Sequence, residues 1–251
     1  MEYRLKKSLG QHFLVNEAIC KNIVAAVLQH SPKQVLEVGP GAGALTKYLI
    51  QQPDMVLKAV ELDTEKVGYL LEYYPQLQNS LINESILTTK LPFTTPFAVV
   101  GNFPYNISTE IVFKMLEWRE HITSVTGMFQ KEVALRLAAK HGSKTYGVTS
   151  VLVQAFFEVN YLFDVSPQNF NPPPKVDSGV LQLIPLAQPI VMHSYKRLSQ
   201  LVKAAFNQRR KTMRNACKSL FLPEALQQPL FSLRAEQLSV AQFAALTYTM
   251  Q

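Results

Sequence analysis

The stretch that decides the fold is Val35-Leu36-Glu37-Val38-Gly39-Pro40-Gly41-Ala42-Gly43-Ala44. A short apolar strand pattern runs into a turn with three glycines, and a helical pattern begins around Leu45. Glycines at such a strand-to-helix turn let the backbone approach a ligand that a Cβ atom would keep away. The stretch therefore predicts a βα unit with a ligand at its turn, although a tight turn without a ligand would look similar.

The same alternation of strand and helix continues to about residue 165, which is typical of a mostly parallel sheet with helices on its faces. The predicted strands cover residues 34–38, 57–61, 79–83, 97–101, 124–129, 156–163 and 176–183. The predicted helices cover residues 16–29, 43–52, 64–73, 108–117, 131–139 and 147–155. We therefore expect an α/β fold of the Rossmann-like, doubly wound type.

Prolines divide this part from the rest of the chain. Residues 167–174 are rich in proline and are expected to be irregular, and Pro185 and Pro189 mark a linker. Beyond the linker the pattern is helical only, with apolar residues at 198, 201, 202, 205 and 206. The sequence predicts two domains, residues 1–189 and a small helical domain of residues 190–251.

The net charge of +7 is concentrated in one segment. Residues 190–218 contain eight lysines and arginines and no acidic residue, whereas the first 189 residues are neutral in sum. Clustered positive charge favours contact with a phosphate backbone, because each contact releases counterions. A solvated helix face is the alternative, and charge alone does not separate the two.

Glu61 ends the strand that follows the glycine turn, about twenty residues downstream. A carboxylate in this position can accept hydrogen bonds from both hydroxyls of a ribose. The turn also fits the pattern G-x-G-x-x-A of nicotinamide dinucleotide sites. These residues predict a nucleoside site and leave open whether NAD or S-adenosylmethionine occupies it.

Asn102-Phe103-Pro104-Tyr105 follows the fourth predicted strand at its carboxyl end, where open α/β sheets place their chemistry. The exocyclic N6 amine of adenine is a poor nucleophile, because its lone pair is delocalised into the ring. Two acceptors, the side-chain oxygen of Asn102 and a backbone carbonyl such as that of Phe103, could bind both N–H groups and favour the nucleophilic form. Tyr105 offers a face for stacking the base. An asparagine turn with a buried aromatic ring is the alternative interpretation.

With these residues, the chain resembles the ribosomal RNA adenine dimethyltransferase family, and within it the KsgA branch. Four blocks carry the resemblance: Lys7-Ser8-Leu9-Gly10-Gln11-His12-Phe13-Leu14, the turn from Glu37 to Gly43, Gly101-Asn102-Phe103-Pro104-Tyr105-Asn106-Ile107-Ser108, and Asn169-Phe170-Asn171-Pro172-Pro173-Pro174-Lys175-Val176-Asp177-Ser178. The third block has Phe103 where the family usually has leucine. The resemblance implies a class I methyltransferase that uses S-adenosylmethionine to dimethylate N6 of two adjacent adenines in small-subunit (16S) rRNA.

The resemblance also implies roles for individual residues. Catalytic roles fall to Asn102, Phe103, Pro104, Tyr105 and Phe170, with Phe170 opposite Tyr105 across the base. The implied cofactor residues are His12, Leu14, Gly39, Gly41, Gly43, Glu61, Ser85 and Asn102. One departure stands out, since Ser85 occupies a position where the family usually has an aspartate that binds the adenine amine of the cofactor. Either Glu84 replaces that aspartate or the cofactor binds more weakly.

The basic segment also resembles the family's ribosome-docking domain. The implied RNA-binding residues are Arg209, Arg210, Lys211, Arg214 and Lys218. Three of them, Arg210, Arg214 and Lys218, are spaced four apart, which predicts one face of a helix. The expected partner is the small ribosomal subunit.

Other features limit the alternatives. The chain has no run of apolar residues long enough to span a membrane and no apolar segment of a secretory signal, so we expect a cytoplasmic protein without a membrane partner. Cys20 and Cys217 lack metal-ligand spacing, and we expect reduced structural thiols, no metal and a monomer. The rival functions are an antibiotic-resistance methyltransferase of large-subunit rRNA, a non-catalytic assembly factor and a DNA adenine methyltransferase. The sequence Asn106-Ile107-Ser108-Thr109 and the proline-rich block favour the small-subunit branch.

Overall fold

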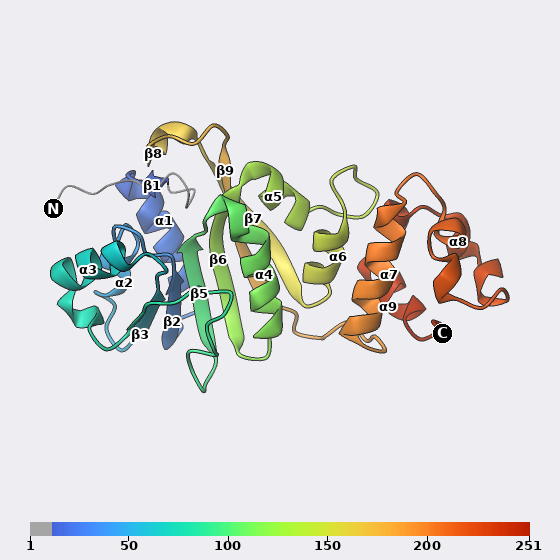
Figure 1. Ribbon diagram of the computed structural model, residues 1–251, viewed down its shortest axis with the longest axis horizontal. Helices are drawn as coiled ribbons and strands as arrows, with labels where there is room; N and C mark the ends of the chain where they lie inside the picture. The colour runs from blue at the N-terminus through green and yellow to red at the C-terminus, as the bar shows by residue number, and fades with distance from the viewer. Residues whose placement is uncertain (1–11) are drawn as a thin grey trace. The chain divides into compact units, whose positions relative to one another are not determined.

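The computed structural model describes residues 12–251, so part of the first block lies outside the described residues. Its main sheet has seven strands in the order β4-β3-β2-β5-β6-β9-β7 (Figure 1). The strands are β2 (Gln34–Val38), β3 (Val56–Val60), β4 (Leu81–Ile82), β5 (Phe97–Asn102), β6 (Ile122–Gln130), β7 (Phe157–Val165) and β9 (Ser178–Pro185). Strands β4, β3, β2, β5 and β6 are parallel, and β9 runs antiparallel to β6. The predicted α/β fold with a mostly parallel sheet is confirmed.

The helices of this part of the chain overlap the ranges that the sequence predicts. They are α1 (Glu17–Leu28), α2 (Thr46–Leu49), α3 (Thr64–Tyr73), α4 (Ser108–Glu117), α5 (Lys131–Leu137) and α6 (Val148–Gln154). Asn16 caps α1 and Asp63 caps α3, each by accepting hydrogen bonds from backbone N–H groups of the first turn. Helices α1 and α2 contact each other, and α4 packs on β6 (Figure 1).

The order of the strands places a crevice between β2 and β5. From β2 the chain moves to β3 and β4 on one side, and then returns to β5 on the other side. At such a switch point the loops after the two strands diverge, and a ligand can enter between the carboxyl ends of the strands. The glycine turn follows β2 and Asn102 ends β5, so both lie at this crevice.

Two predicted elements are shorter than expected. The helix predicted for residues 43–52 covers only Thr46–Leu49, because Gly43 has a φ of +83°, which a right-handed helix does not allow. The strand predicted for residues 79–83 covers only Leu81–Ile82. Asn83 follows the strand, and its side-chain nitrogen donates to the backbone oxygens of Glu61 and Leu62.

A second, two-stranded sheet was not predicted. Strand β1 (Phe13–Leu14) pairs antiparallel with β8 (Phe170–Asn171), so that Leu14 faces Phe170. Asn16 strengthens this connection by donating a side-chain hydrogen bond to Asn169. The pairing attaches the amino-terminal segment to the proline-rich block, more than 150 residues away.

The chain divides into two compact units. Of the described residues, the first unit contains 12–134 and 160–185, and the second contains 135–159 and 186–251. The second unit thus includes α6, which the sequence analysis assigned to the first domain. Between residues 12 and 251, no helix has the length and hydropathy needed to cross a membrane.

In the second unit, α7 (Tyr195–Asn207) and α9 (Val240–Leu246) pack with α6, and α8 (Met213–Ala216) packs on α7. The expected apolar stripe of α7 is buried, and the ring of Phe206 lies 5.9 Å from the rings of both Tyr146 and Phe243. Arg197 donates to the backbone oxygens of Thr247 and Met250 and so fixes the last residues of the chain to α7.

The prediction that Arg210, Arg214 and Lys218 share one helix face is wrong. Arg210 lies in a turn after α7, Arg214 lies in the four-residue helix α8, and Lys218 begins the short 3-10 helix η5 (Lys218–Leu220). The helix is interrupted because Thr212 is extended and bridges Arg234 in an antiparallel pair.

Candidate active site

The glycine turn serves both the ligand pocket and the packing of the protein. Gly39 and Gly41 have φ values of +66° and +60°, in the left-handed region that favours glycine, and both line the pocket at the switch point. Gly43 does not line this pocket. A Cβ atom on Gly43 would come within 2.5 Å of the ring of Tyr74, so this glycine is explained by packing against the end of α3.

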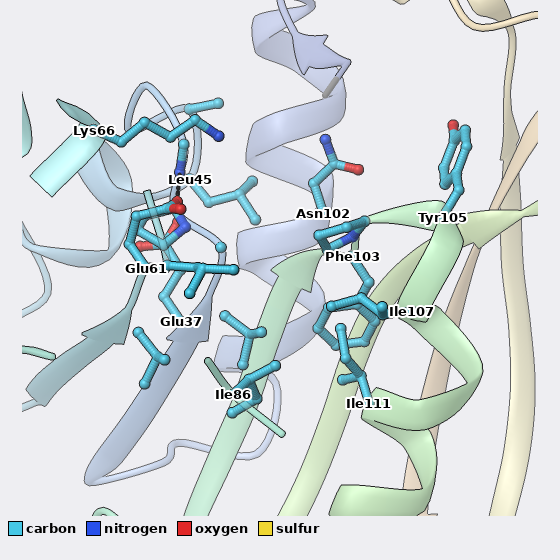
Figure 2. A pocket seen from close by; sticks show the side chains of 18 of the residues that line it. Glu37, Leu45, Glu61, Lys66, Ile86, Asn102, Phe103, Tyr105, Ile107 and Ile111 are labelled. Carbon is cyan, nitrogen blue, oxygen red and sulfur yellow. Dashed lines mark hydrogen bonds between the residues drawn. The ribbon is translucent and has the colours of Figure 1, made fainter. Parts of the chain in front are cut away.

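Glu61 is held rigidly at the end of β3. One carboxylate oxygen accepts from the N–H of Gly41 at 3.2 Å, and the other accepts from the N–H of Asp63 at 2.9 Å. The side chain is only 6% exposed and borders the pocket (Figure 2). Each carboxylate oxygen keeps a free lone pair, so the group can accept two further hydrogen bonds from a ligand.

Two further charged residues border the same end of the pocket, and the sequence analysis gave neither of them a role. Glu37 on β2 is 1% exposed and accepts a 2.7 Å hydrogen bond from the hydroxyl of Thr46. Burial raises the pKa of this carboxyl to about 7, although the hydrogen bond from Thr46 acts in the opposite direction. Lys66 on α3 is 6% exposed, and its Nζ lies 5.2 Å above the centre of the Phe13 ring.

Asn102 has one defined orientation. Its side-chain nitrogen donates to the backbone oxygen of His12 at 2.9 Å. Since a backbone oxygen can only accept, this bond identifies the nitrogen end of the amide and leaves the oxygen end as an acceptor. Figure 2 shows this oxygen turned toward the side of the pocket on which Tyr105 lies.

Tyr105 is the aromatic residue at this end of the pocket. It begins the 3-10 helix η3 (Tyr105–Ile107), and its phenol shares a hydrogen bond with the hydroxyl of Ser178. The ring of His12 lies 5.7 Å from that of Tyr105, tilted by 30°, and His12 Nδ1 donates to the backbone oxygen of Pro172. Burial raises the pKa of the Tyr105 phenol, so the group stays protonated and can donate.

Most of the predicted site residues meet in this one pocket. Ten of the twelve predicted catalytic and cofactor residues line it: His12, Leu14, Gly39, Gly41, Glu61, Ser85, Asn102, Phe103, Pro104 and Tyr105. The two others are Gly43 and Phe170. Phe170 is 4% exposed and packs in the hydrophobic core with Leu14, so the structure does not place it opposite Tyr105 across the pocket.

Ser85 and its neighbour Glu84 both line the pocket. The hydroxyl of Ser85 accepts from the N–H of Leu87, and the Ser85 backbone oxygen accepts from the hydroxyls of Thr88 and Thr89. Ser85 therefore stabilises its own turn. Glu84 is exposed and also lines the pocket, so a carboxylate is present next to Ser85, as the first of the two alternatives requires.

Apolar pocket residues were also missed by the sequence analysis. They are Phe13, Leu45, Ile86, Leu87, Ile107 and Ile111. Apolar residues in loops and helices carry no motif, and only the folded arrangement indicates that they face a cavity. Phe13 and Ile107 had a signal, because they lie in the first and third blocks of the resemblance.

The five predicted RNA-binding residues lie in the second unit, and all are exposed. Arg209 donates to the backbone oxygens of Lys144 and Tyr146, and Arg214 donates to that of Leu226. These two arginines thus also hold the second unit together. For Arg210, Lys211 and Lys218, no such bond is found within residues 12–251.

The parallel sheet, the acidic nucleoside-type pocket at its switch point and the Asn-Phe-Pro-Tyr turn after β5 define the class I methyltransferase fold. A dimethyladenosine transferase from Plasmodium falciparum matches with a TM-score of 0.78 and 25% identity, covering 92% of this chain and 94% of that one. The 23S rRNA methyltransferase ErmE has the same fold, with a TM-score of 0.71 at 24% identity and coverage of 94% and 99%.

The sequence comparisons are more specific. The model of the family "ribosomal RNA adenine dimethylase" matches residues 2–250. A "Ribosomal RNA small subunit methyltransferase A" from Cytophaga hutchinsonii is 50% identical over 248 residues, which cover 97% of this chain and 96% of the relative. The chain belongs to the ribosomal RNA adenine dimethylase family, as the four blocks predicted.

Proposed function

We propose that this protein dimethylates N6 of two adjacent adenines in small-subunit rRNA during biogenesis of the subunit, with S-adenosylmethionine as the methyl donor. The observation that carries the proposal is the fixed amide of Asn102, whose oxygen remains an acceptor beside Tyr105. The name of the relative that is 50% identical supports the small subunit as the substrate.

Asn102 prepares the amine for attack. Its side-chain oxygen accepts one N–H of the adenine amine, and the backbone oxygen of Phe103 accepts the other. Both bonds favour the pyramidal amine, in which the lone pair is available. The bond to His12 holds the amide in advance, so little reorganisation is needed when the base arrives. No strong base is needed before methyl transfer, so we assign no residue near Asn102 the role of a general base.

Tyr105 holds the base by stacking. Its ring borders the pocket, and its hydroxyl is engaged away from the amine with Ser178. Stacking on an aromatic ring suits a base that has been taken out of its RNA helix. Phe170 is buried in the core, so its predicted role on the opposite face of the base would require it to move, and that role stays a prediction.

The residues of the pocket fit S-adenosylmethionine. Glu61, fixed by two N–H donors, can accept both ribose hydroxyls. The positive φ of Gly39 and Gly41 favours glycine, so the turn beside Glu61 carries no side chain at these two positions. Ile86 adds an apolar surface for an adenine ring. When bound, the cofactor supplies an electrophilic methyl group on a sulfonium, and the protein aligns the amine with it. The carboxylate of Glu84, and not the hydroxyl of Ser85, would accept a hydrogen bond from the adenine amine of the cofactor.

The second unit would dock the ribosomal subunit through its basic residues, and we retain residues 190–251 as the RNA-binding part. The segment 135–159 packs with it and belongs to the same compact unit. We further expect a cytoplasmic monomer that needs no metal, in keeping with a substrate that is assembled in the bacterial cytoplasm.

The direct experiment uses small and large ribosomal subunits from cells that lack this protein. The purified protein should convert adenine to N6,N6-dimethyladenosine in the small-subunit rRNA of these particles, detected by mass spectrometry of both rRNAs. Modification of the large-subunit rRNA instead would favour the resistance-type activity. No modification of either rRNA would favour a non-catalytic assembly factor.

A further inference from the structure

Ser178 begins β9, yet it lies at the edge of the sheet where the parallel strands end. Strand β9 runs antiparallel to β6, and Ser178, its first residue, pairs with Gln130, the last residue of β6. In the parallel pair of β5 and β6, Asn102 pairs with Met128. Ser178 therefore lies two residues beyond the level of Asn102, at the edge where the loop containing Tyr105 leaves β5.

The hydroxyl of Ser178 is buried and has a specific partner. Ser178 is 0% exposed, and its Oγ is hydrogen-bonded to the phenol of Tyr105. Ser124 and Thr126 on β6 are equally buried, but their hydroxyls have no hydrogen-bond partner within residues 12–251. A serine in this part of the sheet does not find a partner automatically, so the bond to Tyr105 is a particular feature of position 178.

The ring of Tyr105 is half-buried at the edge of the pocket. Its residue begins a one-turn helix, and its backbone oxygen accepts a 3.2 Å bond from the hydroxyl of Ser108. The ring must also leave a face open to the pocket, so packing can fix it on one side only. His12, which also lines the pocket, contributes a tilted ring contact at 5.7 Å. A hydrogen bond at the far end of the ring restricts the motion that these contacts leave.

We infer that Ser178 is a positioning residue, which fixes the ring of Tyr105 so that the target base stacks in register with Asn102. The inference rests on the proposed function, because only that function supplies a base that stacks on the ring of Tyr105. The second methyl transfer depends most on this bond. A monomethylated amine has one N–H left for Asn102 or Phe103, so stacking must then supply more of the alignment.

The test is a double-mutant cycle with Ser178→Ala, Tyr105→Phe and the double variant, using small subunits as substrate. Each single change removes the same hydrogen bond and should slow the second methylation by about three- to tenfold, since a net hydrogen bond is modest in strength. N6-monomethyladenosine should accumulate, while the affinity for S-adenosylmethionine stays unchanged. The double variant should be no slower than the slower single variant, because the bond can be lost only once.

Ser124→Ala is the matched control, since it removes an equally buried serine hydroxyl from the same sheet without touching Tyr105. It should leave the ratio of mono- to dimethylated product at the wild-type value. If the effects of Ser178→Ala and Tyr105→Phe multiply, or if Ser178→Ala behaves like Ser124→Ala, the positioning role is overturned while the proposed function stands. A wild-type protein that does not methylate the subunit would overturn the proposed function itself.

Discussion

The side-chain nitrogen of Asn102 is bonded at 2.9 Å to the backbone oxygen of His12, a residue 90 positions earlier in the chain. The bond joins the end of β5 to the segment that leads into β1. It gives the amide a fixed orientation before any substrate binds, and it joins His12 to the candidate site.

The first prediction concerns this amide. Asn102→Ala removes an acceptor at the reacting amine, and the loss of such a preorganised group slows a reaction by about 10²–10³-fold. Methyl transfer to isolated small subunits should fall by this amount, whereas binding of the subunit should persist through the second unit. Filter binding and mass spectrometry measure the two properties separately. Normal dimethylation by a folded Asn102→Ala protein would remove Asn102 from the mechanism.

The second prediction concerns the ribose of the cofactor. Glu61→Gln removes the charge and one of the two oxygens that accept from the N–H groups of Gly41 and Asp63. Charge-assisted hydrogen bonds worth about 1.5–3 kcal/mol are lost, so the affinity for S-adenosylmethionine should fall roughly ten- to hundredfold. Titration calorimetry measures this directly. Glu72→Gln, on an exposed position of α3, is the control and should bind normally.

Two results would contradict that assignment. Unchanged cofactor affinity in Glu61→Gln would show that the carboxylate does not contact the ribose. Binding of NAD by the wild type, without binding of S-adenosylmethionine, would mean that the glycine turn serves a dinucleotide.

The third prediction concerns the basic residues. Arg209 and Arg214 also bind backbone oxygens, so their replacement would disturb the second unit as well as any RNA contact. A cleaner variant neutralises Arg210, Lys211 and Lys218. If each contacts a phosphate, the slope of log affinity against log salt should decrease by about 2–3, and cofactor binding should not change.

The control for charge alone is a triple neutralisation of Lys21, Lys33 and Lys90, which are exposed on the first unit. This variant should keep the affinity and the salt slope of the wild type. Equal losses in both triple variants would indicate a general effect of net charge, and no loss in the first would make the basic segment a solvated surface.

The central part of the fold was predictable because local and long-range preferences agree there. The strand before Gly39 and the glycine turn each have a clear local pattern, and the mostly parallel sheet follows from the alternation of strands with helices. The position of Asn102 at the end of β5 and in the pocket agrees with the prediction, and its role toward an amine substrate stays a prediction. In each case a short stretch of sequence carries the whole signal.

The other features depend on contacts between distant residues. The pairing of β1 with β8 involves two residues on each strand, too few to show a periodic pattern. The expected helix of basic residues is interrupted because Thr212 pairs with Arg234, and helical spacing cannot reveal that competition. Gly43 looked like a ligand-binding glycine, but only the position of Tyr74 shows that it is needed for packing.

The last prediction concerns Glu37, whose carboxyl is buried beneath the glycine turn. Burial raises its pKa from 4.5 to about 7 in the folded protein, more than the hydrogen bond from Thr46 lowers it, and the charge of Glu61 raises it further. Between these two pH values the folded state binds more protons than the unfolded state. The contribution of Glu37 to stability therefore falls as the pH rises from about 4.5 to about 7, and is constant above that range.

Glu37→Gln should remove this dependence, because the amide does not titrate and its oxygen can still accept from Thr46. Between pH 5 and pH 8, the free energy of unfolding of the variant should rise relative to that of the wild type by on the order of 3 kcal/mol. Urea unfolding at a series of pH values measures this difference, with Glu72→Gln as the exposed control. A difference that is constant from pH 5 to pH 8 would mean that Glu37 has an ordinary pKa in the folded protein. A difference that moves in favour of the wild type would mean that Glu37 is stabilised as a carboxylate, and that Lys66 or the turn N–H groups outweigh the cost of its burial.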